Sequence, residues 1–235
     1  MQVNVPEPPS AGSGTHGGGL PLPRVAWPSR LPHWLLGLYM AWWIVLAIDP
    51  VNRQDWLLEN LLVFLCLPPL LFTRRRFCFS NASYSLIAVF LALHAVGAHY
   101  TYSEMPVFNW MRDGMALGRN HYDRVVHFLF GFLLSLPTWE LVVAILGLRP
   151  GWARVGAVHA IMAWSAAYEM IEALVAHVVS PELGAAYNGT QGDIWDAQKD
   201  AALAMFGAIL AMTLAALLAR WARARASSAN PVGPA

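Results

Sequence analysis

Six long stretches of mostly apolar residues constrain the fold of this chain more than any other feature. They lie at about 32–48, 57–73, 80–99, 124–147, 155–178 and 197–219. Each approaches the roughly 20 apolar residues that an α-helix needs to cross a bilayer, although the first two are marginal in length. The sequence therefore predicts an all-α fold: a polytopic membrane helical bundle of about six transmembrane helices.

The composition agrees with a membrane location. Of the 235 residues, 57% are hydrophobic and only 12% are charged, whereas a soluble domain carries about 25% charged residues. The net charge of +1 gives no indication of a nucleic-acid partner. Cys66 and Cys78 form neither a disulfide framework nor a zinc-binding spacing. We interpret both cysteines as packing residues.

The basic residues predict the topology of the bundle. Ten of the 15 lysine and arginine residues fall on one side of the six stretches, which predicts that both termini are cytoplasmic. Residues 1–30 are rich in glycine, proline and serine, and we expect them to be disordered. Residues 31–220 form the expected membrane domain, and residues 221–235 a short, disordered basic tail. The expected location is the bacterial inner (cytoplasmic) membrane, which the chain crosses several times.

Nearly all the acidic and histidine side chains inside the apolar stretches fall at the same depth, near the outer face of the bilayer, when each helical residue adds about 1.5 Å. They are His94, His99, His127, Glu169, Glu172, Asp196 and Asp200. Ionisable groups in hydrocarbon are energetically costly and need partners, water or a metal ion. This polar layer therefore predicts a functional site on the outer side.

Spacing within each stretch agrees with a shared site. Asp123 and His127 are four residues apart, so they share one helix face. Glu169 and Glu172 are three apart and also share a face. Asp193, Asp196 and Asp200 step by three and four at the start of the last stretch, where Asp193 or Asp196 can cap the helix.

Three kinds of chemistry fit such a layer. Histidine and carboxylate side chains can hold a divalent metal such as iron, manganese or zinc, act as general acid and base, or relay protons. The candidate catalytic residues are His127, Glu169, Asp123 and Glu172. The candidate metal ligands are His94, His99, His127, Glu169, Asp196 and Asp200. A divalent metal is the possible cofactor, and the sequence leaves all three kinds of chemistry open.

Three arginines place positive charge beside these carboxylates: Arg112, Arg119 and Arg124. Paired hydrogen bonds from their guanidinium groups can hold a lipid phosphate. For Arg124 we favour a second interpretation, in which it neutralises Asp123 or Glu172. Glu140 lies in the inner half of its stretch, and we expect it to pair with a nearby arginine or tryptophan.

Two motifs carry a resemblance to a known family. They are His121-Tyr122-Asp123-Arg124-Val125-Val126-His127-Phe128 and the run from Gly189 to Asp200, with Ala167-Tyr168-Glu169 between them. Together they resemble the YjdF-like family of bacterial inner-membrane proteins, which has no assigned function. The resemblance implies a polytopic bacterial membrane protein with an outward polar site, and it implies no particular reaction.

Residues 121–219 also resemble, more loosely, the VanZ-like domain that is linked to glycopeptide resistance. That pattern matches Asp123, His127, Phe128, Glu169, Asp193, Asp196 and Gly207. The chain departs from it at Arg124, where lysine is usual, and at Asp200, where asparagine is frequent.

Three functions remain open at this point. The first is an enzyme in the outer leaflet that acts on a lipid or lipid-linked cell-envelope substrate. The second is a structural or regulatory membrane protein whose polar layer joins helices. The third is a proton-coupled transporter, which is disfavoured because the layer is confined to one leaflet and the chain has no inverted repeat. The expected partners are membrane lipids and a lipid-linked substrate, with no nucleic acid.

Overall fold

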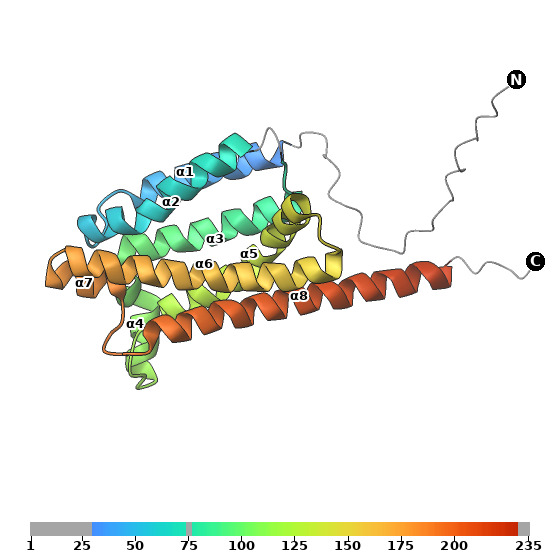
Figure 1. Ribbon diagram of the computed structural model, residues 1–235. Helices are drawn as coiled ribbons and strands as arrows, with labels where there is room; N and C mark the ends of the chain where they lie inside the picture. Colours follow the sequence, from blue (N-terminus) through green and yellow to red (C-terminus); the bar gives the residue numbers. More distant parts are fainter. Residues whose placement is uncertain (1–29, 74–76, 230–235) are drawn as a thin grey trace, which may run out of the picture.

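The computed structural model describes residues 30–73 and 77–229, and these residues form a bundle of helices (Figure 1). The six long helices are α1 (Leu31–Leu46), α2 (Arg53–Thr73), α3 (Asn81–Tyr100), α5 (Tyr122–Leu146), α6 (Pro150–Val178) and α8 (Asp196–Ala229). Shorter elements are a 3-10 turn (Tyr102–Glu104), α4 (Pro106–Gly114) and α7 (Pro181–Asn188). The described residues contain no strand, which confirms the all-α prediction.

Successive long helices run in alternating directions, so their connections gather at the two ends of the bundle (Figure 1). One end carries residues 47–52, 101–121 and 179–195, with the short helices α4 and α7. We call this the loop end. The opposite end carries the start of α1, the tight α5–α6 connection and the free end of α8.

Within the described residues, four helices are long and apolar enough to cross a membrane: α2, α3, α5 and α8. The predicted polytopic membrane bundle is therefore confirmed. α1 is apolar but has only 16 residues, and α6 has 29 residues but carries Glu169 and Glu172 in its second half. The count of six spans and the cytoplasmic termini stay predictions.

The contact between α5 and α8 is unusually close because glycines replace side chains at the crossing. A Cβ atom added to Gly131 of α5 would lie 1.8 Å from the carbonyl oxygen of Ala204. On α8, a Cβ atom added to Gly207 would lie 2.2 Å from the carbonyl oxygen of Phe128. The two backbones therefore touch directly, as is common where small residues line a contact between membrane helices.

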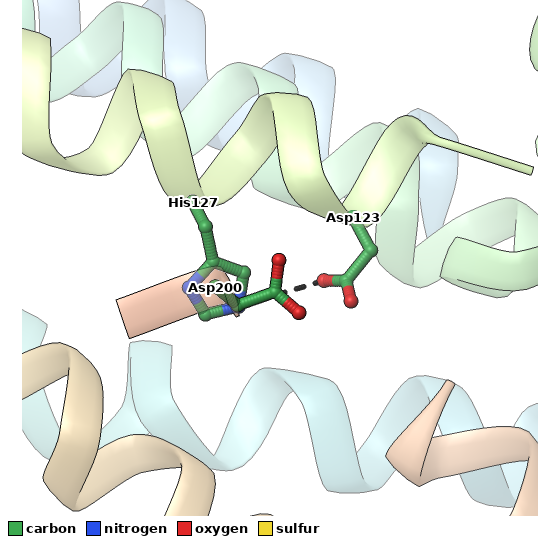
Figure 2. Close-up of side chains that lie close together, drawn as sticks. All are labelled: Asp123, His127 and Asp200. Atoms are coloured by element: carbon green, nitrogen blue, oxygen red, sulfur yellow. Dashed lines mark ion pairs between the residues drawn. The ribbon is translucent and has the colours of Figure 1, made fainter. Parts of the chain in front are cut away.

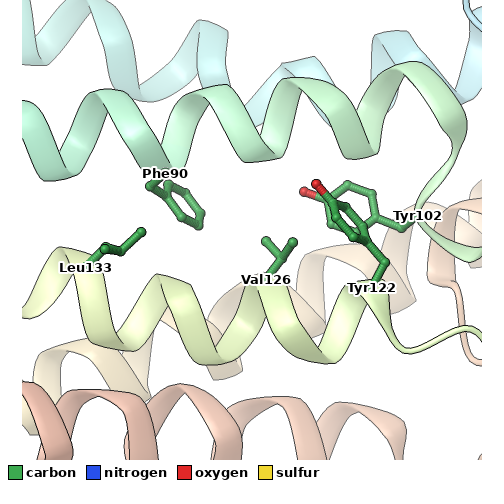
Figure 3. Close-up of a cluster of buried hydrophobic side chains, with 5 residues drawn as sticks. All are labelled: Phe90, Tyr102, Tyr122, Val126 and Leu133. Atoms are coloured by element: carbon green, nitrogen blue, oxygen red, sulfur yellow. The ribbon is translucent and has the colours of Figure 1, made fainter. Parts of the chain in front are cut away.

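The opposite side of α5 packs against α3 through a cluster of apolar side chains (Figure 3). The buried members are Phe90, Tyr102, Tyr122, Val126 and Leu133. The Tyr122 hydroxyl also donates to the carbonyl of Leu93 on α3, at 2.7 Å. Because this face of α5 is fixed on α3, the neighbouring face with Asp123 and His127 turns toward α6 and α8.

The last helix is longer than the sequence predicted. α8 continues to Ala229, so residues 221–229, expected as part of a disordered tail, are helical. Its free end projects beyond the other helices (Figure 1). There the Arg225 guanidinium lies over the ring of Trp221, 3.8 Å from its centroid. The expected disorder of residues 1–29 and 230–235 concerns segments outside the described residues.

The glycine contact predicts a sharp sensitivity to one methyl group. We expect Gly131→Ala to push α5 away from α8 and to lower the unfolding free energy by about 1–3 kcal/mol, the usual cost of overpacking. A thermal melt of the detergent-solubilised protein measures the effect. Gly37→Ala is the matched control, because nothing lies within 4 Å of a Cβ atom there. Equal losses in both variants would contradict the assigned contact.

Candidate functional site

His127 lies at the centre of the polar layer, near the loop end of α5. Its Nε2 atom is 3.5 Å from Asp123 Oδ1 and 3.2 Å from Glu169 Oε1. Its Nδ1 atom is 3.2 Å from the hydroxyl of Ser165. The imidazole is thus held between α5 and α6, and its 7% exposure keeps it almost out of solvent.

Asp200 of α8 completes a compact group with Asp123 and His127 (Figure 2). Each of these residues offers a ligand atom, and the three atoms lie within 4.8 Å of one another. The Asp200 side chain is only 1% exposed, yet neither carboxylate oxygen has a hydrogen-bond partner. A buried carboxylate without a donor is costly, so this group calls for a proton or a cation.

Arg119 joins the loop before α8 to the start of α5. It forms an ion pair with Asp196, and its guanidinium lies 3.9 Å from Asp123 Oδ2. It also donates to the backbone carbonyls of Gly189, at 3.1 Å, and Thr190, at 3.4 Å. Its side chain is 7% exposed. Arg119 therefore fixes the position of Asp196, one turn before Asp200.

Arg124 pairs with the same loop. Its NH2 group contacts Asp193 and lies 3.3 Å from Asp196 Oδ1. Among the described residues, the ion pairs of Arg124 are therefore with Asp193 and Asp196 rather than with Asp123 or Glu172, although its charge also acts on Asp123. Arg119 is the guanidinium beside Asp123, and the sequence pattern did not distinguish the two arginines. Both are engaged by aspartates, but the buried Nε atom of Arg124 has no hydrogen-bond partner, and the lipid-phosphate interpretation stays a prediction.

Asp193 lies outside the membrane-spanning segments and is strongly stabilised as an anion. Hydrogen bonds from Lys199, at 2.6 Å, and from the backbone of Trp195, with Arg124 beside them, lower its pKa to about 2. A carboxyl group whose pKa is lowered stabilises the fold above its unfolded value of about 3.9. That contribution is lost only as the pH falls toward 2. The ion pairs of Asp193 with Lys199 and Arg124 are thus intact across the whole neutral and mildly acidic pH range.

A second polar group lies between α2 and α3. The Thr101 hydroxyl donates to Asp55 Oδ2 at 2.7 Å. His94 Nδ1 is 2.6 Å from the Tyr102 hydroxyl, and its Nε2 is 3.1 Å from the carbonyl of Glu59. Both ring nitrogens of His94, a predicted metal ligand, are therefore occupied by hydrogen bonds. His94 stabilises the packing of α3 on α2 and does not join the group around His127.

The remaining predicted residues are His99, which belongs to neither group, and Glu172. His99 contacts the carbonyl of Leu46 at 2.9 Å, away from His127. Glu172 lies beside Glu169 and Tyr168. The Tyr168 hydroxyl also donates to Glu59 Oε2 at 3.3 Å and so connects the two groups.

Sequence reasoning placed some of these residues incorrectly or left them out. Asp55, Glu59, Ser165 and Tyr168 were not among the candidates. Glu59 carries a usable signal, because it lies inside the second apolar stretch. Glu140 lies at the far end of the bundle, where its Oε2 atom accepts from the backbone nitrogen of Ser80 at 2.9 Å.

The charges around His127 do not balance. In the described structure, six carboxylates belong to the His127 group, to the neighbouring helix turn or to the ion pairs beside it: Asp123, Glu169, Glu172, Asp193, Asp196 and Asp200. Three basic side chains lie among them: Arg119, Arg124 and Lys199. Protons or a bound cation must supply the missing positive charge, since isolated carboxylates are not stable in a low dielectric.

Loss of Arg119 should destabilise the protein far more than loss of an exposed arginine. We expect Arg119→Gln to lower the unfolding free energy by about 3–5 kcal/mol, because it leaves Asp196 and Asp123 buried without their cation. Arg112→Gln is the control, since Arg112 pairs with Asp113, whose side chain is 69% exposed, and should cost about 0–1 kcal/mol. Thermal melts of the two variants measure the difference. Similar losses of stability would contradict the role of Arg119 as the buried cation of Asp196 and Asp123.

Comparisons with known proteins agree with these membrane features. A family model described as predicted membrane protein (DUF2238) matches residues 31–221. Inner membrane protein YjdF of Escherichia coli (strain K12) is 33% identical over 167 residues, which cover 71% of this chain and 79% of that protein. No solved structure gives a significant match.

These matches test the resemblances drawn from the motifs. The YjdF-like resemblance and the bacterial inner-membrane location are confirmed, whereas the VanZ-like resemblance stays a prediction. The family match runs from the first residue of α1 to Trp221 in α8. The chain therefore belongs to the DUF2238 family of integral membrane proteins.

Proposed function

We propose that this protein is a metal-dependent enzyme of the inner membrane that acts on a lipid or lipid-linked cell-envelope substrate at the outer leaflet. The observation that carries the proposal is the state of Asp200. Its carboxylate is buried, has no hydrogen-bond partner on either oxygen, and shares a 4.8 Å cluster with Asp123 and His127. A bound divalent cation would supply the positive partner that this carboxylate lacks.

The donor set indicates which ion suits the site. Asp123 and Asp200 offer oxygens, and His127 offers a ring nitrogen. Glu169 Oε1 has no hydrogen-bond partner and lies 3.2 Å from His127 Nε2, so it is available as a further ligand or as a base. Mixed nitrogen and oxygen ligands suit zinc, manganese or iron. Asp196, a predicted ligand, is engaged by Arg119 and acts by holding the loop.

Each group has a role in such a reaction. A divalent ion bound here would polarise a substrate oxygen and activate a water molecule near neutral pH. Glu169 is in position to act as a general base through its Oε1 atom, because it lies at the edge of the cluster and lines a pocket. Ser165 orients the imidazole of His127 through Nδ1.

The distribution of arginines supports an outward site. Arg30, Arg149, Arg154, Arg220 and Arg225 belong to the end of the bundle opposite the His127 group. Under the positive-inside rule that end is cytoplasmic. The loop end, with the candidate metal ligands, then faces the outer leaflet, where a lipid substrate can approach sideways between helices.

Metal content tests the proposal directly. We expect near-stoichiometric divalent metal by plasma mass spectrometry in protein purified gently and without chelator. His127→Ala and Asp200→Asn should each weaken metal binding by at least about tenfold, since even the removal of a supporting partner costs that much. Thermal melts of the same samples verify that the variants fold.

Glu182→Gln provides the matched control, because Glu182 is exposed on α7 at the same end of the bundle. Its metal content should equal that of the unaltered protein. Equal metal in all four samples would place the ion elsewhere and contradict the site. No metal in any of them would contradict the metal chemistry and leave His127 and Glu169 as an acid–base pair.

A further inference from the structure

A pocket of about 350 Å³ lies beside the His127 group, between α6, the α7–α8 loop and the first turn of α8. This volume falls within the range of small-molecule sites. Its polar lining consists of the carboxylates Glu169, Asp193 and Asp196 and the neutral side chains Asn188, Thr190 and Gln198. Glu169 belongs to both the pocket and the His127 group, so a ligand in the pocket would reach the candidate metal ligands.

The polar groups of the pocket differ in their availability. Asp193 and Asp196 are already paired with Arg119, Arg124 and Lys199. Glu169 has no arginine or lysine partner: its nearest basic group is the imidazole of His127, at 3.2 Å, its side chain is nine-tenths buried, and its Oε1 atom has no hydrogen-bond partner. The amides of Asn188 and Gln198 make no side-chain hydrogen bond within the described structure. One carboxylate and two amides are thus free to contact a ligand.

This set of free groups selects a chemical class of ligand. Amides both donate and accept hydrogen bonds, and a carboxylate accepts them, so a ligand with several hydroxyl groups satisfies all three. An anionic phosphate would meet three carboxylates, and no basic side chain lines the described pocket. The metal ion of the proposed function would supply the positive charge that Glu169 lacks, so a cationic headgroup has no unpaired carboxylate left to bind. The lining therefore favours a neutral ligand over either ion.

Apolar side chains beside the pocket add a second requirement. Ile194 lines the pocket and is 85% exposed. On α6, Met170 and Leu174 directly follow the lining residues Glu169 and Ala173 and are 73% and 64% exposed. An amphipathic ligand could place its apolar chains along this surface while its headgroup fills the pocket.

We infer that the pocket binds a neutral, polyhydroxylated headgroup, and that a glycolipid presents it. This inference rests on the proposed function, because it assigns the substrate class of the same site. A free sugar offers the same hydroxyl groups without the apolar chains. The test must therefore separate the two sources of that chemistry.

Native mass spectrometry of the protein, in a detergent without a sugar headgroup, provides the test. The probes are glucosyl-diacylglycerol, phosphatidylglycerol and phosphatidylethanolamine with identical acyl chains, together with free glucose. We expect glucosyl-diacylglycerol to bind most tightly. Asn188→Ala and Gln198→Ala should each weaken its binding by about 2- to 10-fold, the effect of one lost hydrogen bond. Gln54→Ala, an exposed amide at the start of α2, should leave it unchanged.

The outcomes separate the headgroup from the metal. Tighter binding of either phospholipid, or equal effects of Gln54→Ala and Gln198→Ala, would overturn the inference. Free glucose that competes as well as the glycolipid, with the same sensitivity to Asn188→Ala, would support the pocket and identify a free sugar as the source. Metal content measured on the same samples is an independent readout, since His127→Ala should lose metal while Asn188→Ala keeps it.

Discussion

The direct backbone contact between α5 and α8 is the constraint on which the candidate site depends. Gly131 and Gly207 leave no room for a side chain at the crossing. His127 directly precedes Phe128, and Asp200 lies one turn before Ala204, the two residues whose backbones make this contact. The contact therefore brings the ligand atoms of His127 and Asp200 within 4.8 Å of each other. Larger residues at the crossing would separate the two helices and, with them, the carboxylate from the imidazole.

The ion pairs at the loop end add a second, independent restraint. Arg119 binds Asp196 and two backbone carbonyls of the α7–α8 loop, and Arg124 binds Asp193 and Asp196. These contacts neutralise the aspartates that lie outside the cluster and leave Asp200 without a cation. The arginines thus neutralise the aspartates of the loop, whereas the buried carboxylate of Asp200 next to them has no basic partner.

Much of this arrangement could be predicted from the sequence because membrane helices obey simple length and periodicity rules. Spacing placed Asp123 and His127 on one face, and depth placed Glu169 and Asp200 beside them. Depth alone could not show that His94 and His99 belong to other contacts, since periodicity gives the face of a helix but not its neighbours. The partners of Arg119 were equally inaccessible, because they lie about 70 residues away along the chain.

The length of α8 links the site to the thickness of the membrane. Asp200 and Arg220 are 20 residues apart on one continuous helix, which corresponds to about 30 Å, the thickness of a typical hydrocarbon core. When Arg220 and Trp221 anchor at one interface, Asp200 therefore lies at the edge of the other. A thinner bilayer would leave the cluster around Asp200 outside the hydrocarbon core, and a thicker one would enclose it, so bilayer thickness sets the depth at which a substrate meets the site.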